Sequence, residues 1–118
     1  MVKSKFGELR IDYSGFTCPV QKAVTIIGDK WTLFVLREFF YNKSKQGFNE
    51  LQYNLKPISS RTLSKKLKKL VENKLLVKKI LSNNPPKVEY SLTKKGLNLE
   101  HLLKEFGRWY KGYKPLSN

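Results

Sequence analysis

Residues 58–76 read ISSRTLSKKLKKLVENKLL, a run of leucines and cations at helical spacing. Numbered as a helix, the run places its apolar residues on one side: Leu63, Leu67, Leu70 and Val71. It places its cations on the other side: Arg61, Lys65, Lys68 and Lys69. The pattern predicts a helix over about residues 60–73 with one buried and one basic face, begun by Ser59 as N-cap.

The segments next to this helix define its motif. A shorter helix is expected over residues 48–55 and is closed by Pro57, so only a few residues separate the two helices. That is helix-turn-helix spacing. Downstream, residues 75–81 and 88–92 are rich in Val, Leu, Ile and Tyr and are separated by SNNPPK, which predicts a β-hairpin with a stiff tip. A hairpin directly after a helix-turn-helix is a winged helix.

The outer segments complete the predicted order. A short amphipathic helix should begin at Pro19 and stop near Gly28. A helix over about 30–40 is apolar nearly all round, so it should be the buried central helix. Residues 42–47 are expected to be a polar loop.

The two ends of the chain lie outside this core. Residues 1–18 read as an arm with a short helix or strand, and Thr93 can cap a last helix over about 94–112. The predicted fold class is α+β, mostly α: one winged helix-turn-helix domain over 1–118. It comprises an arm (1–18), a core (19–92) and a C-terminal dimerisation helix (93–112).

Charge is concentrated around the predicted motif. The chain has 118 residues and a formal net charge of +15, with 24 Lys and Arg against 9 Asp and Glu. Residues 56–95 hold twelve of the basic and two of the acidic side chains, a net charge of +10. A charge that served only solubility would not concentrate in this way, so we expect a polyanionic partner.

The composition also indicates a compartment. Cys18 is the single cysteine, so no intramolecular disulfide can form, and a reducing cytoplasm fits. No stretch resembles a signal peptide, and the apolar runs are too short to span a bilayer. We expect a cytoplasmic protein with no membrane partner.

Several motifs carry a resemblance to a known family. They are CPVQKAVTIIGDKWTLFVLREF (18–39), GFNELQYNL (47–55), ISSRTLSKKLKKLVENKLLVKK (58–79) and VEYSLTKKG (88–96). Together with a final helix that carries Trp109, they resemble the HxlR family of winged-helix transcriptional regulators, relatives of the MarR-like group. The resemblance covers about residues 16–110 and implies a homodimer that binds operator DNA.

Three positions depart from the pattern of that family. Asp29 and Lys74 stand where the family commonly has Gly, and Gly47 stands where it often has Arg. The departure at Lys74 requires Asn73 or Lys74 to adopt a left-handed backbone conformation at the end of the basic helix.

The basic helix is the predicted DNA-reading element, although a charged helix face is in general most often only solvated. An α-helix fits the major groove, and its N-terminal half usually reaches the bases. Arg61, Thr62 and Lys65 lie there, whereas Ser60, Lys68 and Lys69 suit phosphates, which position the protein without specifying sequence. The predicted contacts of this helix are Ser60, Arg61, Thr62, Ser64, Lys65, Lys68 and Lys69.

The hairpin is the predicted wing. It would place Lys79, Asn83, Asn84 and Lys87 on the phosphate backbone or in the minor groove, unless its tip is an ordinary loop. Two functions remain as alternatives to a sequence-specific regulator: a weakly specific architectural DNA-coating protein, and a winged helix used for protein–protein assembly with an acidic partner.

Apolar residues at the two ends predict a dimer interface, the alternative being that they pack on the subunit's own core. The last helix carries them at spacings of three and four, which makes a stripe wide for a domain of this size. The predicted interface residues are Phe6, Tyr13, Phe16, Leu99, Leu102, Leu103, Phe106, Trp109, Tyr110 and Tyr113.

Cys18 has two possible roles. The resemblance implies that it could sense oxidants, as a cysteine at this position does in some family members, and a helix N-terminus with Lys22 one turn away favours a thiolate. The alternative, which we favour, is a small buried residue, because free cysteine is among the most buried residue types.

Catalysis and metal binding have no support in the sequence. His101 is the only histidine, no His/Cys cluster exists, and no glycine-rich phosphate loop is present. We therefore expect no enzyme activity, no metal and no cofactor, with double-stranded DNA and a second subunit as the partners.

Overall fold

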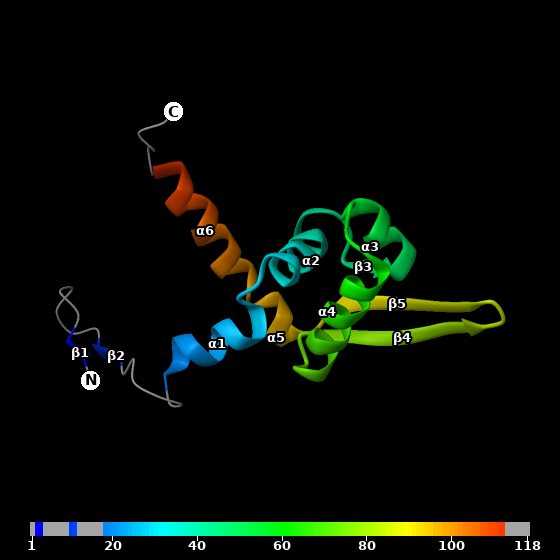
Figure 1. The fold of residues 1–118 in the computed structure, drawn as a ribbon, viewed down its shortest axis with the longest axis horizontal. Coiled ribbons are helices and arrows are strands. Elements are labelled where there is room, and N and C mark those ends of the chain that lie inside the picture. The colour runs from blue at the N-terminus through cyan, green and yellow to red at the C-terminus, as the bar shows by residue number, and fades with distance from the viewer. Residues whose placement is uncertain (1, 4–9, 12–17, 113–118) are drawn as a thin grey trace.

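The structure is a computed structural model, and it describes residues 2–3, 10–11 and 18–112. Helices gather at one end of a small three-stranded antiparallel sheet, and the two long strands of that sheet extend away from the body as a hairpin (Figure 1). The elements in chain order are β1 (Val2–Lys3), β2 (Arg10–Ile11), α1 (Pro19–Ile27), α2 (Lys30–Tyr41), β3 (Lys45–Gly47), α3 (Phe48–Asn54), α4 (Ser60–Glu72), β4 (Leu76–Asn83), β5 (Pro86–Leu92), α5 (Lys94–Leu97) and α6 (Glu100–Gly112).

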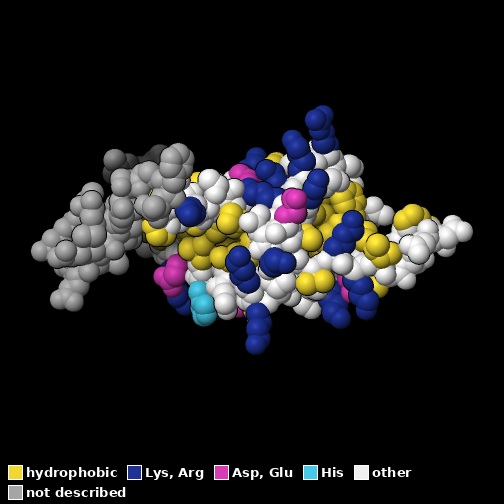
Figure 2. Space-filling model, turned by 90° about the horizontal axis from the view of Figure 1, so that it is seen from below, with side chains coloured by type: hydrophobic (Ala, Val, Ile, Leu, Met, Phe, Trp, Pro, Cys, Tyr) yellow, Lys and Arg dark blue, Asp and Glu magenta, His cyan; other side chains and the backbone are white. Residues whose placement is uncertain are grey.

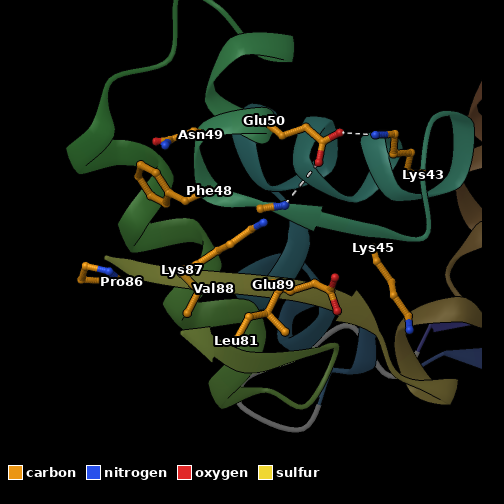
Figure 3. A pocket seen from close by; sticks show the side chains of 11 residues that line it. Lys43, Lys45, Phe48, Asn49, Glu50, Leu81, Pro86, Lys87, Val88 and Glu89 are labelled. Carbon is orange, nitrogen blue, oxygen red and sulfur yellow. Dashed lines mark hydrogen bonds and ion pairs between the residues drawn. The ribbon is translucent and has the colours of Figure 1, made fainter. Parts of the chain in front are cut away.

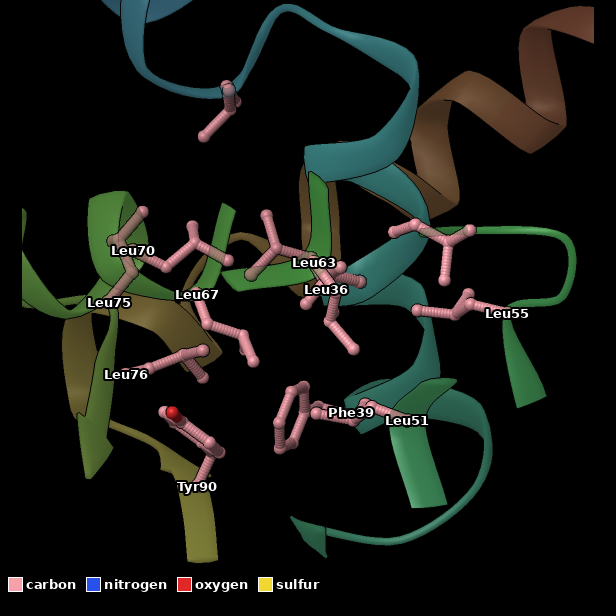
Figure 4. Close-up of a cluster of buried hydrophobic side chains, with 13 residues drawn as sticks. Leu36, Phe39, Leu51, Leu55, Leu63, Leu67, Leu70, Leu75, Leu76 and Tyr90 are labelled. Carbon is pink, nitrogen blue, oxygen red and sulfur yellow. The ribbon is translucent and has the colours of Figure 1, made fainter. Parts of the chain in front are cut away.

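The hydrophobic core forms where α4 lies against α2, α3 and the base of the hairpin. Leu63, Leu67 and Leu70 of α4 are 0%, 1% and 0% exposed, which confirms the predicted buried face of this helix. Figure 4 shows these leucines meeting Leu36 and Phe39 of α2, together with side chains from α3 and the two long strands. The core therefore fixes α4 by one face only and leaves the other face outside.

Helix α2 is central, as expected, but it is not buried on every side. Val35, Leu36 and Phe39 are buried, whereas Arg37 and Tyr41 are exposed. The remaining aromatic and aliphatic side chains of α2 are only half-buried in the single subunit. The nearly uniform apolar sequence of α2 therefore predicts more burial than this helix has in the single subunit.

The expected polar loop over residues 42–47 contains a strand that the sequence analysis missed. Its last three residues form β3, which pairs with β5 so that the strand order in the sheet is β3-β5-β4. The buried side chain of Gln46 explains this arrangement, because its Nε2 donates to the carbonyl oxygens of Glu38 at 3.0 Å and Lys43 at 2.9 Å. Gln46 is polar, yet it fills a buried position and caps the end of α2. The polar composition of residues 42–47 was therefore not evidence for a loop throughout.

The hairpin is longer than expected, although its position is confirmed. Strands β4 and β5 pair from Leu76↔Leu92 out to Asn83↔Pro86, with an irregularity between Ile80 and Ser82. Only Asn84 and Pro85 form the turn. The residues of the SNNPPK tip are therefore mostly strand residues, held in register with the opposite strand.

The end of α4 is closed by a Schellman motif. The N–H of Lys74 donates to the carbonyl oxygen of Val71 at 3.0 Å, and that of Leu75 donates to Leu70 at 2.9 Å. Of the two residues considered for the left-handed position, Lys74 takes it with a φ of 61°, while Asn73 has a φ of −89°. A lysine pays steric energy there that glycine would not.

Lys74→Gly should therefore stabilise the fold by about 0.5–1 kcal/mol, the relief of left-handed strain less the greater flexibility of glycine in the unfolded chain. Urea denaturation measures the change. Asn73→Gly is the matched control and should destabilise, because it gains no strain relief and loses the Nδ2 hydrogen bond of 2.9 Å to the Lys69 carbonyl oxygen. A destabilised Lys74→Gly would contradict this account.

The predicted single last helix is in fact two helices, α5 and α6, separated by Asn98 and Leu99. Helix α5 is held on the base of the hairpin by Thr93, whose Oγ1 donates to the Lys74 carbonyl oxygen at 2.6 Å. Gly96 allows this close approach, since a Cβ there would lie 2.2 Å from the Leu75 carbonyl oxygen. After that contact the chain turns and α6 leaves the body on the side away from the hairpin (Figure 1).

The N-terminal arm is described only in part. β1 pairs antiparallel with β2 through Val2↔Ile11 and Lys3↔Arg10, so the arm contains the short strand that was one of the two expected possibilities. The predicted interface residues Phe6, Tyr13, Phe16 and Tyr113 lie outside the described residues.

Candidate nucleic-acid interface

The N-terminus of α4 is fixed by two hydroxyl groups. Ser59 caps the helix as predicted, its Oγ accepting from the N–H of Thr62 at 3.1 Å. The neighbouring Ser60 Oγ accepts from Gln52 Nε2 of α3 at 2.8 Å. This second hydrogen bond links the two helices of the motif, so the first turn of α4 has a defined position relative to α3.

Most of the predicted DNA contacts on α4 are exposed. Ser60, Arg61, Ser64, Lys65 and Lys68 are exposed, whereas Thr62 and Lys69 are half-buried. Figure 2 shows the molecule from below the view of Figure 1, and Lys and Arg side chains stand out across its body with few acidic side chains beside them. The structure therefore gathers the predicted cations of α4 on the face opposite to the buried leucines.

Two lysines of α4 are engaged by Asp29, which the sequence analysis did not foresee. Lys66 Nζ lies 3.1 Å from Asp29 Oδ1 and Lys69 Nζ lies 3.5 Å from Oδ2. The same carboxylate caps α2, accepting from Thr32 N at 2.9 Å and from Thr32 Oγ1 at 2.7 Å. Lys69, predicted as a phosphate contact, therefore shares its charge with a carboxylate of its own chain.

These contacts change the acidity of Asp29. Partial burial raises the pKa of the carboxyl group, but the hydrogen bonds from Thr32 and the contact with Lys66 outweigh it and lower the pKa from 3.8 to about 2. The folded state thus favours the ionised form more than the unfolded chain does. Asp29 contributes stability that is complete above pH 4 and is lost as the pH falls through about 2.

Asp29→Asn should accordingly destabilise the fold at pH 7 by about 1 kcal/mol, a value reduced for the partial exposure of the ion pairs. Asparagine is also a good N-cap residue, so the loss of stability measures the contribution of the Asp29 charge. Urea denaturation of both proteins should show the difference shrinking between pH 4 and pH 2. Glu72→Gln, an exposed acid on α4 without an ion pair among the described residues, is the control and should have little effect.

A groove separates α4 from the hairpin. It has a volume of about 580 Å³, a mainly apolar floor that includes Leu67, Val88 and Tyr90, and Lys68 and Lys78 at its polar positions. Burial raises the pKa of Tyr90, so its hydroxyl stays neutral at physiological pH. The groove is open beside the exposed face of α4, which makes Lys78 a further cation near this helix.

Strand geometry distinguishes Lys78 from Lys79, the lysine selected from the sequence. Lys78 lies opposite Tyr90 and Ile80 lies opposite Val88, so these residues share the sheet face toward α4. Lys79 lies opposite Glu89 on the other face. The alternation of Leu76 and Lys78 along the strand was the signal that could have identified Lys78.

The other predicted wing residues lie at the end of the hairpin. Asn83, Asn84 and Lys87 are all exposed. The hydroxyl of Ser82 donates to the Pro85 carbonyl oxygen at 3.0 Å and holds the turn. The tip thus carries exposed amides and one cation beyond the body of the protein (Figure 1).

Helices α1 and α6 carry exposed apolar side chains. No residue of α6 is buried, and Leu102, Phe106, Trp109 and Tyr110 are 37–68% exposed. Leu103 is half-buried, and Leu99, just before α6, packs partly against the subunit's own core. Val20 and Val24 of α1 are 48% and 56% exposed, so α1 also presents an apolar surface in the single subunit.

Cys18 is 4% exposed and is the N-cap of α1, where its Sγ accepts from the N–H of Gln21 at 3.5 Å. His101 is exposed on α6. Within the described ranges, no three His, Cys, Asp or Glu side chains lie together as a metal site would require. No helix among the described residues has the length and apolar character needed to cross a membrane.

Comparison with known proteins gives one consistent result. The family model for HxlR-like helix-turn-helix proteins matches residues 26–118. The chain is 34% identical to the HTH-type transcriptional regulator YdeP of Bacillus subtilis over 110 residues, covering 91% of this chain and 84% of YdeP. It is 33% identical to the HTH-type transcriptional regulator sll1512 of Synechocystis over 90 residues, covering 76% of this chain and 65% of that protein.

A solved structure agrees with the sequence comparisons. The crystal structure of a MarR-family transcriptional regulator from Porphyromonas gingivalis superposes with a TM-score of 0.75 at 32% identity, covering 85% of this chain and 96% of the other. The predicted winged-helix fold class is thereby confirmed.

Proposed function

We propose, because this chain belongs to the HxlR-like helix-turn-helix family of transcriptional regulators, that it acts as a homodimer on an inverted-repeat operator. Helix α4 enters the major groove of double-stranded DNA and the β4–β5 wing contacts the flanking backbone or minor groove. The single free cysteine suits a reducing cytoplasm as its place of action.

The observation that carries this proposal is the exposed basic face of α4. The opposite face of α4 is buried in the core, and hydrogen bonds from Thr62 N to Ser59 Oγ and from Gln52 Nε2 to Ser60 Oγ fix its first turn. Arg61 and Lys65 have no carboxylate partner among the described residues, so their charge is available to a ligand. Local net charge, exposure and helix position together favour DNA over solvent alone.

Roles within the interface follow from position. Arg61, Thr62 and Lys65 read base edges from the N-terminal half of α4, where a recognition helix normally meets the bases. Ser60, Ser64 and Lys68 contact phosphates or bridge to them. Lys69 is the weakest of the proposed contacts, because it reaches DNA only by leaving Asp29.

The wing contributes on both faces of the hairpin. Asn83, Asn84 and Lys87 lie at the tip, where they can meet the backbone or the minor groove of the flanking duplex. Lys78 faces the groove beside α4, whereas Lys79 faces the other side. The proposal keeps Lys79 as a contact and adds Lys78, whose side chain is nearer to the reading helix.

A salt series on selected and random duplexes tests the function. An operator is first obtained by selecting genomic fragments with the purified protein, and binding is followed by fluorescence anisotropy. A specific regulator keeps a preference of about 10³-fold or more at physiological salt. An architectural protein would lose that preference, and an assembly module would bind neither duplex.

For Cys18 we propose a packing and capping role. Cys18→Ser should retain the fold and the operator affinity, because serine is a good N-cap and the change in stability should stay within about 1 kcal/mol. Treatment of the reduced protein with diamide should leave the affinity of both proteins unchanged. A loss of affinity in the wild type alone would instead make this thiol a redox sensor.

A further inference from the structure

Lys69 lies in the line of side chains through which α4 is proposed to meet DNA. Thr62, Lys65 and Lys69 follow one another at spacings of three and four residues, so they share one strip of the helix surface. The strip lies opposite the buried leucines of α4. Lys65 is exposed, whereas Lys69, one turn further along, is half-buried. The position of Lys69 on the helix therefore gives it a place on the DNA-binding surface that its exposure does not match.

The ammonium group of Lys69 is directed to the carboxylate of Asp29, at the N-terminus of α2. Lys69 Nζ lies 3.5 Å from Asp29 Oδ2, and Lys66 Nζ lies 3.1 Å from Oδ1. Thr32 donates to the same two oxygens, its N–H to Oδ1 at 2.9 Å and its hydroxyl to Oδ2 at 2.7 Å. Each oxygen thus contacts one lysine and accepts from Thr32. The carboxylate is therefore fixed on α2 and holds the Lys69 ammonium group on that side of the reading helix.

The other ion pairs of the described residues do not involve α4. Glu50 pairs with Lys43 at 2.7 Å, beside the first turn of α3 (Figure 3). Two more pairs lie within α6. Within the described ranges, Asp29 is thus the only acid that forms ion pairs with the cations of α4.

We propose that Asp29 limits the affinity of α4 for DNA by keeping Lys69 away from the phosphates. This inference rests on the proposed function and names the residue that regulates binding at that site. Lys69 can contact the carboxylate or a phosphate but not both, and the fixed carboxylate cannot follow the lysine to the duplex.

Salt decides between the two contacts of Lys69. The side chains of Lys69 and Asp29 are only 31% and 37% exposed, so mobile ions screen this ion pair less than they screen an exposed contact with a phosphate. At physiological salt the contact with Asp29 is therefore favoured. Arg61 and Lys65 form no ion pair with Asp29, so the restraint changes affinity without changing which bases are read.

Lys69→Ala and Lys68→Ala test the inference in protein that keeps Asp29. Lys68 is exposed and has no ion pair among the described residues. Its loss should therefore reduce the slope of log affinity against log salt on random duplex by about 0.9, the value of one phosphate contact. Lys69→Ala should reduce the slope far less, because its charge is already engaged by Asp29. An equal reduction in the two variants would overturn the proposal.

Asp29→Asn releases Lys69 and should act in the opposite direction. The salt slope should become steeper by about 0.9, so the gain in affinity over the wild type should be about threefold larger at about 50 mM than at about 200 mM salt. Operator and random duplex should gain by the same factor, because phosphate contacts position the protein without specifying sequence. Glu72→Gln, at an exposed position of α4, is the matched control: it changes the net charge equally, releases no lysine and should alter the slope far less.

Asp29→Asn in a Lys69→Ala background completes the cycle. With no Lys69 to release, the substitution should change the slope no more than Glu72→Gln does. A steeper slope that persists in this background would assign the effect to Lys66 or to charge repulsion, and would overturn the proposal. Circular dichroism checks that each variant is folded, and the comparison of Lys68→Ala with Lys69→Ala does not depend on the stability of Asp29→Asn. Wild-type protein that binds no duplex at all would instead overturn the proposed function itself.

Discussion

Phe106→Ala combined with Trp109→Ala is expected to convert the protein into monomers with at least 100-fold weaker operator binding. Both side chains are more than half exposed on α6, a helix with no buried residue in the single subunit. Burial of a large apolar side chain contributes about 1.5–3 kcal/mol, and a two-fold interface counts each residue twice. The double substitution should therefore cost the dimer on the order of 6 kcal/mol.

Sedimentation velocity measures the assembly state and fluorescence anisotropy measures operator binding. Tyr41→Ala, which removes an exposed aromatic side chain from the end of α2, is the matched control and should leave both unchanged. Two recognition helices in a dimer should lie roughly 34 Å apart, one turn of duplex, so operators with half-sites at another spacing should bind weakly. A folded double variant that remains dimeric would place the interface elsewhere.

The second large effect is expected at Arg61. Arg61→Ala should cost about 1–3 kcal/mol on the operator and relax the base preference at one position in each half-site. Arg61 is exposed one residue into α4, where hydrogen bonds to Ser59 and Ser60 fix the first turn. The guanidinium can therefore meet guanine in a defined orientation.

Lys68→Ala provides the comparison within the same helix. Removing this cation should weaken operator and random duplex about equally and reduce the salt slope by about one. Binding measured on operator, on random duplex and on operators altered one base pair at a time separates the two variants. An unchanged operator-to-random ratio in Arg61→Ala would show that α4 does not read bases through this residue.

Local pattern was sufficient for the central elements of the fold. The leucine spacing of α4, the N-cap at Ser59 and the change of period after Leu75 each follow from contacts between residues close in the chain. Pattern failed where a polar side chain is buried against backbone carbonyl groups. Gln46 looked like a loop residue because the carbonyl oxygens it caps belong to the end of α2 and the following turn.

The candidate site was likewise predictable where it depends on local pattern and not where it depends on partners far apart in the chain. The cations of α4 follow from a helical wheel, whereas the pairing of Lys69 with Asp29 joins residues 40 positions apart and leaves no periodic signal. Lys78 could have been identified from the alternation of side chains along β4. The prediction did not assign the residues of the hairpin to its two faces.

The break between α5 and α6 was not recoverable from apolar spacing. Residues 94–112 keep helical periodicity through the break, and Leu99 continues the stripe although it packs on the subunit's own core. The break follows a backbone contact, the close approach of Gly96 to the Leu75 carbonyl oxygen. Side-chain patterns carry no information about such a contact.

The exposed α6 has a consequence for how strongly a regulated gene responds to the amount of this protein. In the proposed dimer, a helix with no buried residue in the subunit would gain its stability by assembly, so the ordering of α6 and the formation of the dimer would be coupled. While most subunits are monomers, the dimer concentration follows the square of the subunit concentration. A doubling of synthesis then raises the DNA-binding form about fourfold, which makes promoter occupancy a threshold response to gene dosage.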